Sequence, residues 1–254
     1  MAISFIHMPL TIFSNLRNIK YRLIDQRGAT FRRLRELYKK GGIREVLRGI
    51  RDYYRHNVSD RTYQDTRVDN ELRWQLIESY LKPEFETLMD LGCADGYFVK
   101  DAARLNLEVL GLEHNINRVK KTSKRLSSYQ NVEIRQLTIA PNNINEIPES
   151  DVILFLTVHH HWVYQYGWSD AADMFRTVCD RGNLVFYEPP GNEALESGDE
   201  LNPAKSQKYY RDVLKDVFGD SISILDVEMA AYKGGKRSDP VFVLDTSDYV
   251  FQPE

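Results

Sequence analysis

The residues with the clearest potential for chemistry form two clusters, and the first is the run Asp90-Leu91-Gly92-Cys93-Ala94-Asp95-Gly96. An apolar stretch over residues 87–91 precedes the glycines, and residues 98–105 have helical character, so the glycines occupy a turn between a strand and a helix. Gly92 and Gly96 allow a sharp turn and a close approach to a ligand, while the start of the helix presents free N–H groups.

Two carboxylates flank this turn. Asp90 lies at the tip of the first strand, where it can accept a hydrogen bond from a ligand ammonium group or order the turn. A second strand over residues 108–112 ends at Glu113, where a carboxylate can hold two ribose hydroxyls. A strand, a glycine turn, a helix and a second strand that ends in an acidic residue are typical of a nucleotide-binding site.

The second cluster is the triplet His159, His160 and His161, which follows the largely apolar run of residues 152–158. Imidazole titrates near neutral pH and is a natural general base for a hydroxyl, so His161 and His160 are candidate catalytic residues. The alternative is that these histidines have a structural position and no catalytic role. Glu188, in Glu188-Pro189-Pro190-Gly191, is either a second acid or base or a structural acceptor.

The elements that must position these residues alternate between helices and short apolar strands from about Tyr63 onward, which predicts a parallel sheet covered by helices. In such sheets the ligand binds beyond the carboxyl ends of the strands, where both clusters lie. The expected strands include residues 87–91, 108–112, 131–136, 221–227 and 240–244. The expected helices include residues 68–81, 98–105 and 202–218, and residues 159–168 are expected to form a loop.

The run from Asp90 to Gly96, followed by Glu113, resembles the first two motifs of the class I S-adenosylmethionine-dependent methyltransferases. Residues 151–162 are similar to that family's fourth strand and the loop after it, and residues 182–189 are similar to its fifth strand. The resemblance covers residues 68–247. It implies an α/β, Rossmann-like, seven-stranded, mostly parallel sheet with helices on both faces, and S-adenosylmethionine as the cofactor. The cofactor-binding residues it implies are Asp90, Gly92, Cys93, Ala94, Gly96, Glu113, Thr138 and Thr157.

Two positions depart from the family pattern. Ala94 replaces the middle glycine of many members, which is tolerable for an alanine with a negative φ but narrows the approach to the ligand. The third strand runs into Leu137-Thr138-Ile139 without the acidic residue that commonly meets the adenine amino group. Adenine must then be held by backbone groups or by Thr138.

The charge is divided unevenly along the chain. Residues 1–60 contain 13 Lys and Arg against 5 Asp and Glu, whereas residues 61–254 contain 21 against 32. Residues 1–60 are therefore expected to form a basic, helical N-terminal segment, and residues 61–254 a methyltransferase domain. Through residues 17–55 the segment could contact an anionic membrane surface, RNA or the acidic domain itself. We expect a cytoplasmic protein, with peripheral membrane attachment as an option.

Three functions are compatible with these features. The first is transfer of a methyl group to a hydroxyl of a small molecule, a glycan or a lipid-linked glycan, and the second is RNA methylation with the basic segment following the phosphates. The third is a non-catalytic scaffold, suggested by Ala94 and by the missing adenine carboxylate. No metal site is expected, because Cys93 and Cys179 lack partner spacing and the histidine triplet lacks a nearby carboxylate.

Overall fold

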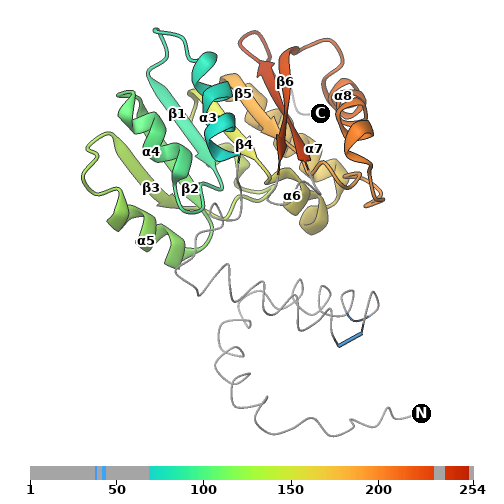
Figure 1. The fold of residues 1–254 in the computed structure, drawn as a ribbon, viewed down its shortest axis with the longest axis horizontal. Helices are drawn as coiled ribbons and strands as arrows, with labels where there is room; N and C mark the ends of the chain where they lie inside the picture. The colour runs from blue at the N-terminus through green and yellow to red at the C-terminus, as the bar shows by residue number, and fades with distance from the viewer. Residues whose placement is uncertain (1–37, 39–41, 44–68, 232–237, 252–254) are drawn as a thin grey trace, which may run out of the picture. The chain divides into compact units, whose positions relative to one another are not determined.

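The computed structural model describes residues 38, 42–43, 69–231 and 238–251 (Figure 1). The chain divides into two units, residues 1–60 and residues 61–254. The expected basic segment lies outside the described residues, apart from Tyr38, Gly42 and Ile43. Its helices and its membrane, RNA or intramolecular partner therefore stay predictions.

The second unit contains the expected seven-stranded sheet, in the order β3-β2-β1-β4-β5-β7-β6. The strands are β1 (Thr87–Leu91), β2 (Glu108–Glu113), β3 (Val132–Gln136), β4 (Ser150–Leu156), β5 (Gly182–Glu188), β6 (Ser223–Ala231) and β7 (Ser238–Asp245). Strands β1 to β5 pair in parallel, and β7 runs antiparallel to both β5 and β6. The predicted Rossmann-like fold class is confirmed, including the antiparallel pair at the end of the sheet.

Helices cover both faces of this sheet (Figure 1). They are α3 (Asn70–Ser79), α4 (Tyr97–Arg104), α5 (Ile116–Arg125), α6 (His159–Tyr166), α7 (Trp168–Asp180) and α8 (Pro203–Phe218), with a 3-10 turn η3 (Ile144–Glu146). One apolar core lies between the sheet and α3 and α4, and the other lies between the sheet and α6, α7 and α8. The carboxyl ends of the parallel strands are thereby left to form the ligand edge.

The segment after β4 differs from the expectation, because residues 159–166 form helix α6 rather than a loop. His159 and Trp162 are buried, and their spacing of three residues places both on one side of a helix. A helix allows both rings to be buried in the aromatic core, which explains why this segment is helical although the run of histidines does not predict it.

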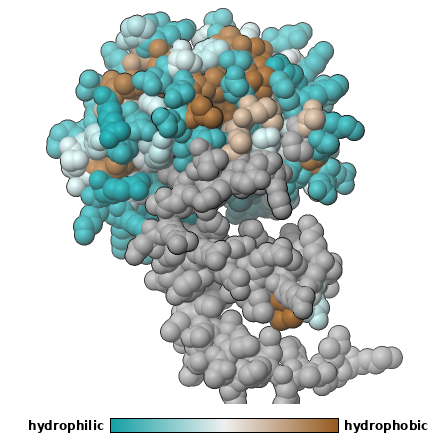
Figure 2. Space-filling view, viewed as in Figure 1, coloured by the Kyte–Doolittle hydropathy of each residue, from teal (hydrophilic) through white to brown (hydrophobic). Residues whose placement is uncertain are grey.

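Hydrophilic side chains occupy most of the visible face of the domain, with apolar ones in patches between them (Figure 2). The exposed apolar residues include Leu72 on α3 and Leu225 and Met229 on β6. Within the described ranges, no helix has the length and apolar character needed to cross a membrane.

Candidate functional site

The glycine turn between β1 and α4 has the left-handed backbone that its sequence suggests. Gly92 and Gly96 have φ of 79° and 66°. The expectation of a negative φ at Ala94 is wrong: its φ is 49°, so the alanine adopts the conformation of the glycine it replaces. The N–H groups of Gly92 and Cys93 donate to the Leu112 carbonyl at 2.8 and 2.9 Å, which ties the turn to β2.

Glu113 fixes this turn from the end of β2. Its side chain is buried, and its carboxylate accepts from the N–H of Ala94 at 3.1 Å and of Asn115 at 2.8 Å. Burial alone would raise its pKa, but His114 at 3.0 Å, the Asn115 N–H and Arg118 at 3.9 Å together lower the pKa below its ordinary value. Glu113 is therefore held as an anion beside the turn, and the hydrogen bond to Ala94 compensates for the strain of a positive φ at a residue with a side chain.

The other residues predicted to contact the cofactor lie along the same edge of the sheet, but their side chains differ in exposure and in contacts. The Cys93 side chain is buried beneath the turn against Gly111, which leaves its backbone to border the site. Thr138 is exposed just after β3. Thr157, with φ of 57°, joins β4 to α6, and its N–H donates to the Glu188 carbonyl at 2.8 Å. None of these contacts is tested by the structure, so they stay predictions.

Asp90 is a buried carboxyl group at the end of β1. Burial raises its pKa to about 7, the nearby Arg73 opposes that rise, and Glu113 adds to it. Its Oδ2 atom has no hydrogen-bond partner among the described residues. An isolated buried carboxylate oxygen is costly, which suits a site that receives a cationic donor from a ligand.

Arg73 is a residue of this site that the sequence analysis missed. It lies on α3 and is buried, with Nη1 2.8 Å from Glu188 Oε2 and the guanidinium carbon 4.9 Å from the centre of the Phe98 ring. A sequence signal was available, since Arg73 follows Asn70 by three residues and precedes the fully buried Ile77 by four. Nothing in that spacing identifies Glu188 as the partner.

Glu188, at the end of β5, is fully buried and forms this ion pair with Arg73. This contact is the one expected if Glu188 is a structural acceptor, the second of the two roles considered from the sequence. A role as acid or base would require the carboxylate to exchange Arg73 for a substrate, and that role stays a prediction.

The three histidines are separated by the first turn of α6. His159 is buried among aromatic rings and shares a hydrogen bond of 2.8 Å with the Tyr187 hydroxyl. Burial lowers its pKa to about 3, against a smaller opposing effect of the Ala171 backbone, so His159 is a neutral core residue at pH 7. His160 is half-buried and His161 is exposed, with their ring centres 3.9 Å apart. The structure thus leaves His161 as the most accessible of the three.

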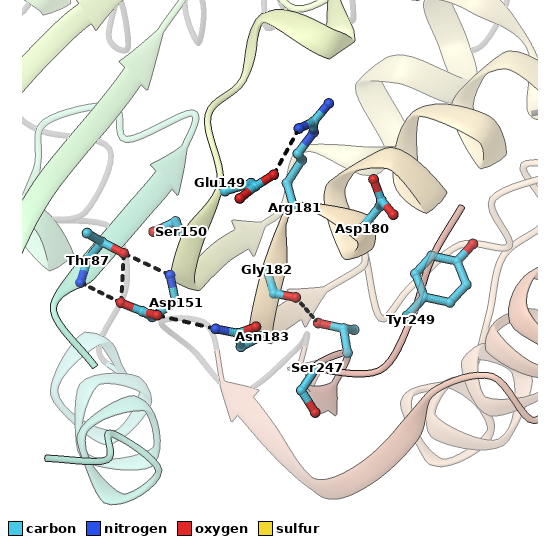
Figure 3. Close-up of a pocket in the computed structure, with 11 residues that line it drawn as sticks. Thr87, Glu149, Ser150, Asp151, Asp180, Arg181, Gly182, Asn183, Ser247 and Tyr249 are labelled. Atoms are coloured by element: carbon cyan, nitrogen blue, oxygen red, sulfur yellow. Dashed lines mark hydrogen bonds and ion pairs between the residues drawn. The ribbon is translucent and has the colours of Figure 1, made fainter. Parts of the chain in front are cut away.

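A separate hollow of about 240 Å³ lies at the opposite, amino edge of the sheet (Figure 3). Its central group is Asp151, which accepts from Thr87 N–H at 3.0 Å, from Thr87 Oγ1 at 2.9 Å and from Asn183 Nδ2 at 3.2 Å. These bonds join β1, β4 and β5, and they satisfy the Asp151 carboxylate without a ligand. We assign this hollow a structural role, and the candidate site remains at the carboxyl edge.

The residues at the carboxyl edge fit S-adenosylmethionine. Gly92 and Gly96 allow the left-handed turn, and Gly96 also lets the turn pack against Thr122 of α5. Glu113 ends β2, where ribose hydroxyls would approach in this fold, and the Asp90 Oδ2 atom is an acceptor for an ammonium group. In the part of the chain that the structure describes, no group of three or more His, Cys, Asp or Glu side chains is placed to hold a metal.

Comparisons with known proteins give the same result. Residues 89–184 match a family model described as a methyltransferase domain. The crystal structure of WbdD has a TM-score of 0.56 and 16% identity, covering 71% of this chain but only 41% of the WbdD chain. The N-methyltransferase NodS from Bradyrhizobium japonicum WM9, in complex with S-adenosyl-L-homocysteine, has a TM-score of 0.56 and 10% identity, covering 76% of this chain and 96% of that one. No curated protein matches this chain.

At these identities the solved structures show the fold, whereas the family model identifies the domain from the sequence. The matched range includes most of β1, all of the glycine turn and Glu113, and it ends inside β5. Residues 89–184 therefore belong to a methyltransferase domain, and the sheet that contains them has the fold of the class I S-adenosylmethionine-dependent methyltransferases.

Proposed function

We propose that the acceptor atom is oxygen, and that this enzyme methylates a hydroxyl of a small molecule, a glycan or a lipid-linked glycan. The observation that carries the proposal is the position of His161, an exposed imidazole in the first turn of α6, directly beyond the carboxyl end of β4. A hydroxyl nucleophile must lose its proton during methyl transfer, and imidazole can accept that proton near neutral pH.

The loop after β5 favours a neutral or cationic acceptor over RNA. It contains Glu193, Glu196, Asp199 and Glu200, and residues 189–202 include no Lys or Arg. The loop is ordered by an antiparallel bridge between Glu193 and Glu200 and by the hydrogen bond from Ala194 N–H to the Asp199 carbonyl at 2.8 Å. Because this loop leaves the carboxyl end of β5, its negative charge lies on the acceptor side, where it would repel a polyanion.

The contribution of this chain to the reaction is mainly positional. Methyl transfer from a sulfonium is an in-line displacement, so holding the nucleophile and the donor collinear supplies much of the rate. The turn at Gly92 and the carboxylates of Asp90 and Glu113 would hold S-adenosylmethionine, which supplies the methyl group. His161, with His160 beside it, would take the proton of the acceptor hydroxyl.

The acceptor can be identified without a guess about its class. The purified protein is incubated with a cell extract and with S-adenosylmethionine that carries a deuterated methyl group, and labelled products are identified by mass spectrometry. We expect a labelled methyl ether. A product labelled on nitrogen, or only on RNA, would refute the proposal while leaving the methyltransferase assignment intact.

We expect His161→Ala to lower acceptor turnover by about 10²–10⁴-fold, the usual contribution of a general base. Affinity for S-adenosylmethionine should change by less than about twofold, because α6 positions the acceptor rather than the cofactor. Release of S-adenosylhomocysteine measures turnover. Gln165→Ala, at another exposed position of α6, is the control. Wild-type turnover in His161→Ala would remove the proposed base.

Cofactor affinity should depend on pH through Asp90. Because its pKa is raised to about 7, the carboxylate that attracts an ammonium group is lost as pH falls below 7. The Kd for S-adenosylmethionine should therefore rise by up to about tenfold per pH unit below 7 and level off above it. Titration calorimetry from pH 5.5 to 8.5 measures this, and Asp90→Asn should remove most of the dependence. A wild-type Kd that is constant across this range would contradict the prediction.

The same pKa has a consequence for the free protein. The folded value of about 7 lies above the ordinary value of 3.8, so the folded state binds more protons between these two pH values. The contribution of Asp90 to stability is therefore present below about pH 4 and is lost as pH rises to about 7. Arg73 and Glu113 are the charged groups that act on it most strongly.

A further inference from the structure

The solvent-facing side of α5 carries positive charge and no negative charge. Residues 114–130 contain five Lys and Arg and no Asp or Glu. Val119 and Thr122 are buried beneath the helix. With about 3.6 residues per turn, the side opposite these two consists of exposed cationic residues, which are Lys120, Lys121, Lys124 and Arg125.

Carboxylates on the neighbouring elements are engaged within those elements. On β3, which packs against α5, Glu133 is paired with Arg135 at 2.8 Å. On α4, Asp101 is paired with Arg104 at 3.0 Å. The positive charge of α5 is therefore a property of this surface, and it attracts anions from solution.

The opposite charge is concentrated farther along the same edge of the sheet. Residues 189–202, the loop after β5, contain four Asp and Glu and no Lys or Arg. Helix α5 follows β2, and the strand order places β1 and β4 between β2 and β5, a separation of about 14 Å. The domain is thus electrically polar, and an anionic surface would orient it with α5 toward that surface.

The apolar residue at the start of α5 favours a membrane over RNA as the anionic partner. Ile116 is 41% exposed and lies one turn before Lys120. A row of cations beside an exposed apolar side chain is typical of helices that lie on a membrane, where the cations meet phosphates and the apolar group enters the headgroup region. Proteins that bind single-stranded RNA commonly add aromatic side chains that stack on bases, and residues 115–128 contain none.

We propose that the solvent-facing side of α5 docks on an anionic membrane surface, with Lys120, Lys124 and Arg125 as its cations and Ile116 as its apolar contact. This docking does not depend on the acceptor of the methyl group. One consequence does rest on the proposed function. Because β5 lies about 14 Å from β2 along the sheet, the acceptor side would stand off the membrane, where a hydroxyl on the glycan of a lipid-linked acceptor can reach it.

Cosedimentation with vesicles tests the docking. The purified protein should bind vesicles of phosphatidylcholine and phosphatidylserine, and it should bind vesicles of phosphatidylcholine alone much more weakly. The variant K120Q/K124Q/R125Q should bind the anionic vesicles about 100-fold more weakly, since each cation near such a surface contributes about fivefold. The matched control K205Q/K208Q/K215Q removes the same charge from exposed positions of α8, at the other end of the sheet (Figure 1), and should stay within about threefold of wild type.

A second variant, N117D/S123E, keeps the test valid if the triple variant does not fold by circular dichroism. It adds two negative charges at exposed positions of α5 without removing a cation, and it should weaken vesicle binding by about 20-fold. The inference is overturned if wild type binds both kinds of vesicle equally, or if the α5 variants bind as well as the α8 control.

An RNA oligonucleotide provides the competing outcome. If the wild-type protein binds it and not the anionic vesicles, and the α5 variants lose that binding, the surface is a nucleic-acid surface and the inference is overturned. Failure to bind either probe overturns it as well. No methyl transfer is measured in these experiments, so such a failure leaves the proposed hydroxyl acceptor to be judged by its own labelling test.

Discussion

Gly92→Val should weaken S-adenosylmethionine binding by at least about 100-fold while the domain remains folded, because the substitution acts at the turn that the ligand approaches. Gly92 has φ of 79°, which valine adopts only with strain. A Cβ atom at this position would lie 2.8 Å from Val158 Cγ2, so the start of α6 would also have to shift. Titration calorimetry measures the binding, and circular dichroism measures the fold.

Gly219→Val is the control that distinguishes the effect of backbone strain from the effect of steric crowding at the cofactor site. Gly219 follows α8 with φ of 61°, and a Cβ there would meet no atom within 4 Å. This variant should lose some stability, since valine again occupies a left-handed conformation, but it should bind S-adenosylmethionine with normal affinity. If Gly92→Val also bound normally, the cofactor site would have to lie elsewhere.

Glu188→Ala should lower the free energy of unfolding by about 3–5 kcal/mol, the usual cost of removing one partner from a buried ion pair. The Arg73 side chain is 6% exposed, so its charge cannot reach water without movement of α3. Urea denaturation followed by circular dichroism measures the loss. Glu188→Gln should lose less, because the amide oxygen can still accept from Arg73 Nη1.

Glu149→Ala is the matched control for this loss. Glu149 also pairs with an arginine, Arg181, at 3.4 Å, but its side chain is 81% exposed. Removal of that surface pair should cost less than about 1 kcal/mol. Equal losses in the two alanine variants would show that the pair of Arg73 and Glu188 is not a stabilising buried interaction.

The cofactor turn could be predicted from the sequence because its parts are contiguous. The turn consists of an apolar strand, glycines that tolerate positive φ, a helix and a strand that ends in Glu113. Each of these signals depends only on residues within about one helical turn or one strand length of each other. Only the backbone of Ala94 was misjudged. A hydrogen bond from its N–H to Glu113, 19 positions away, holds it in the left-handed conformation.

Tertiary structure alone decided the partners of the charged and polar side chains. Arg73 and Glu188 are separated by 115 positions and meet because α3 packs on the face of the sheet that carries Phe186 of β5, in the core that also contains Ile77. His159 differs from His161 only in the side of α6 that it occupies, yet the core lowers its pKa to about 3 and leaves His161 exposed. Backbone preferences are local and can be read from neighbouring residues. Burial and charge pairing depend instead on which distant surfaces the completed sheet brings together. The sequence by itself therefore determined the cofactor turn and the fold around it. Tertiary packing decided which side chains at that turn remain available for chemistry.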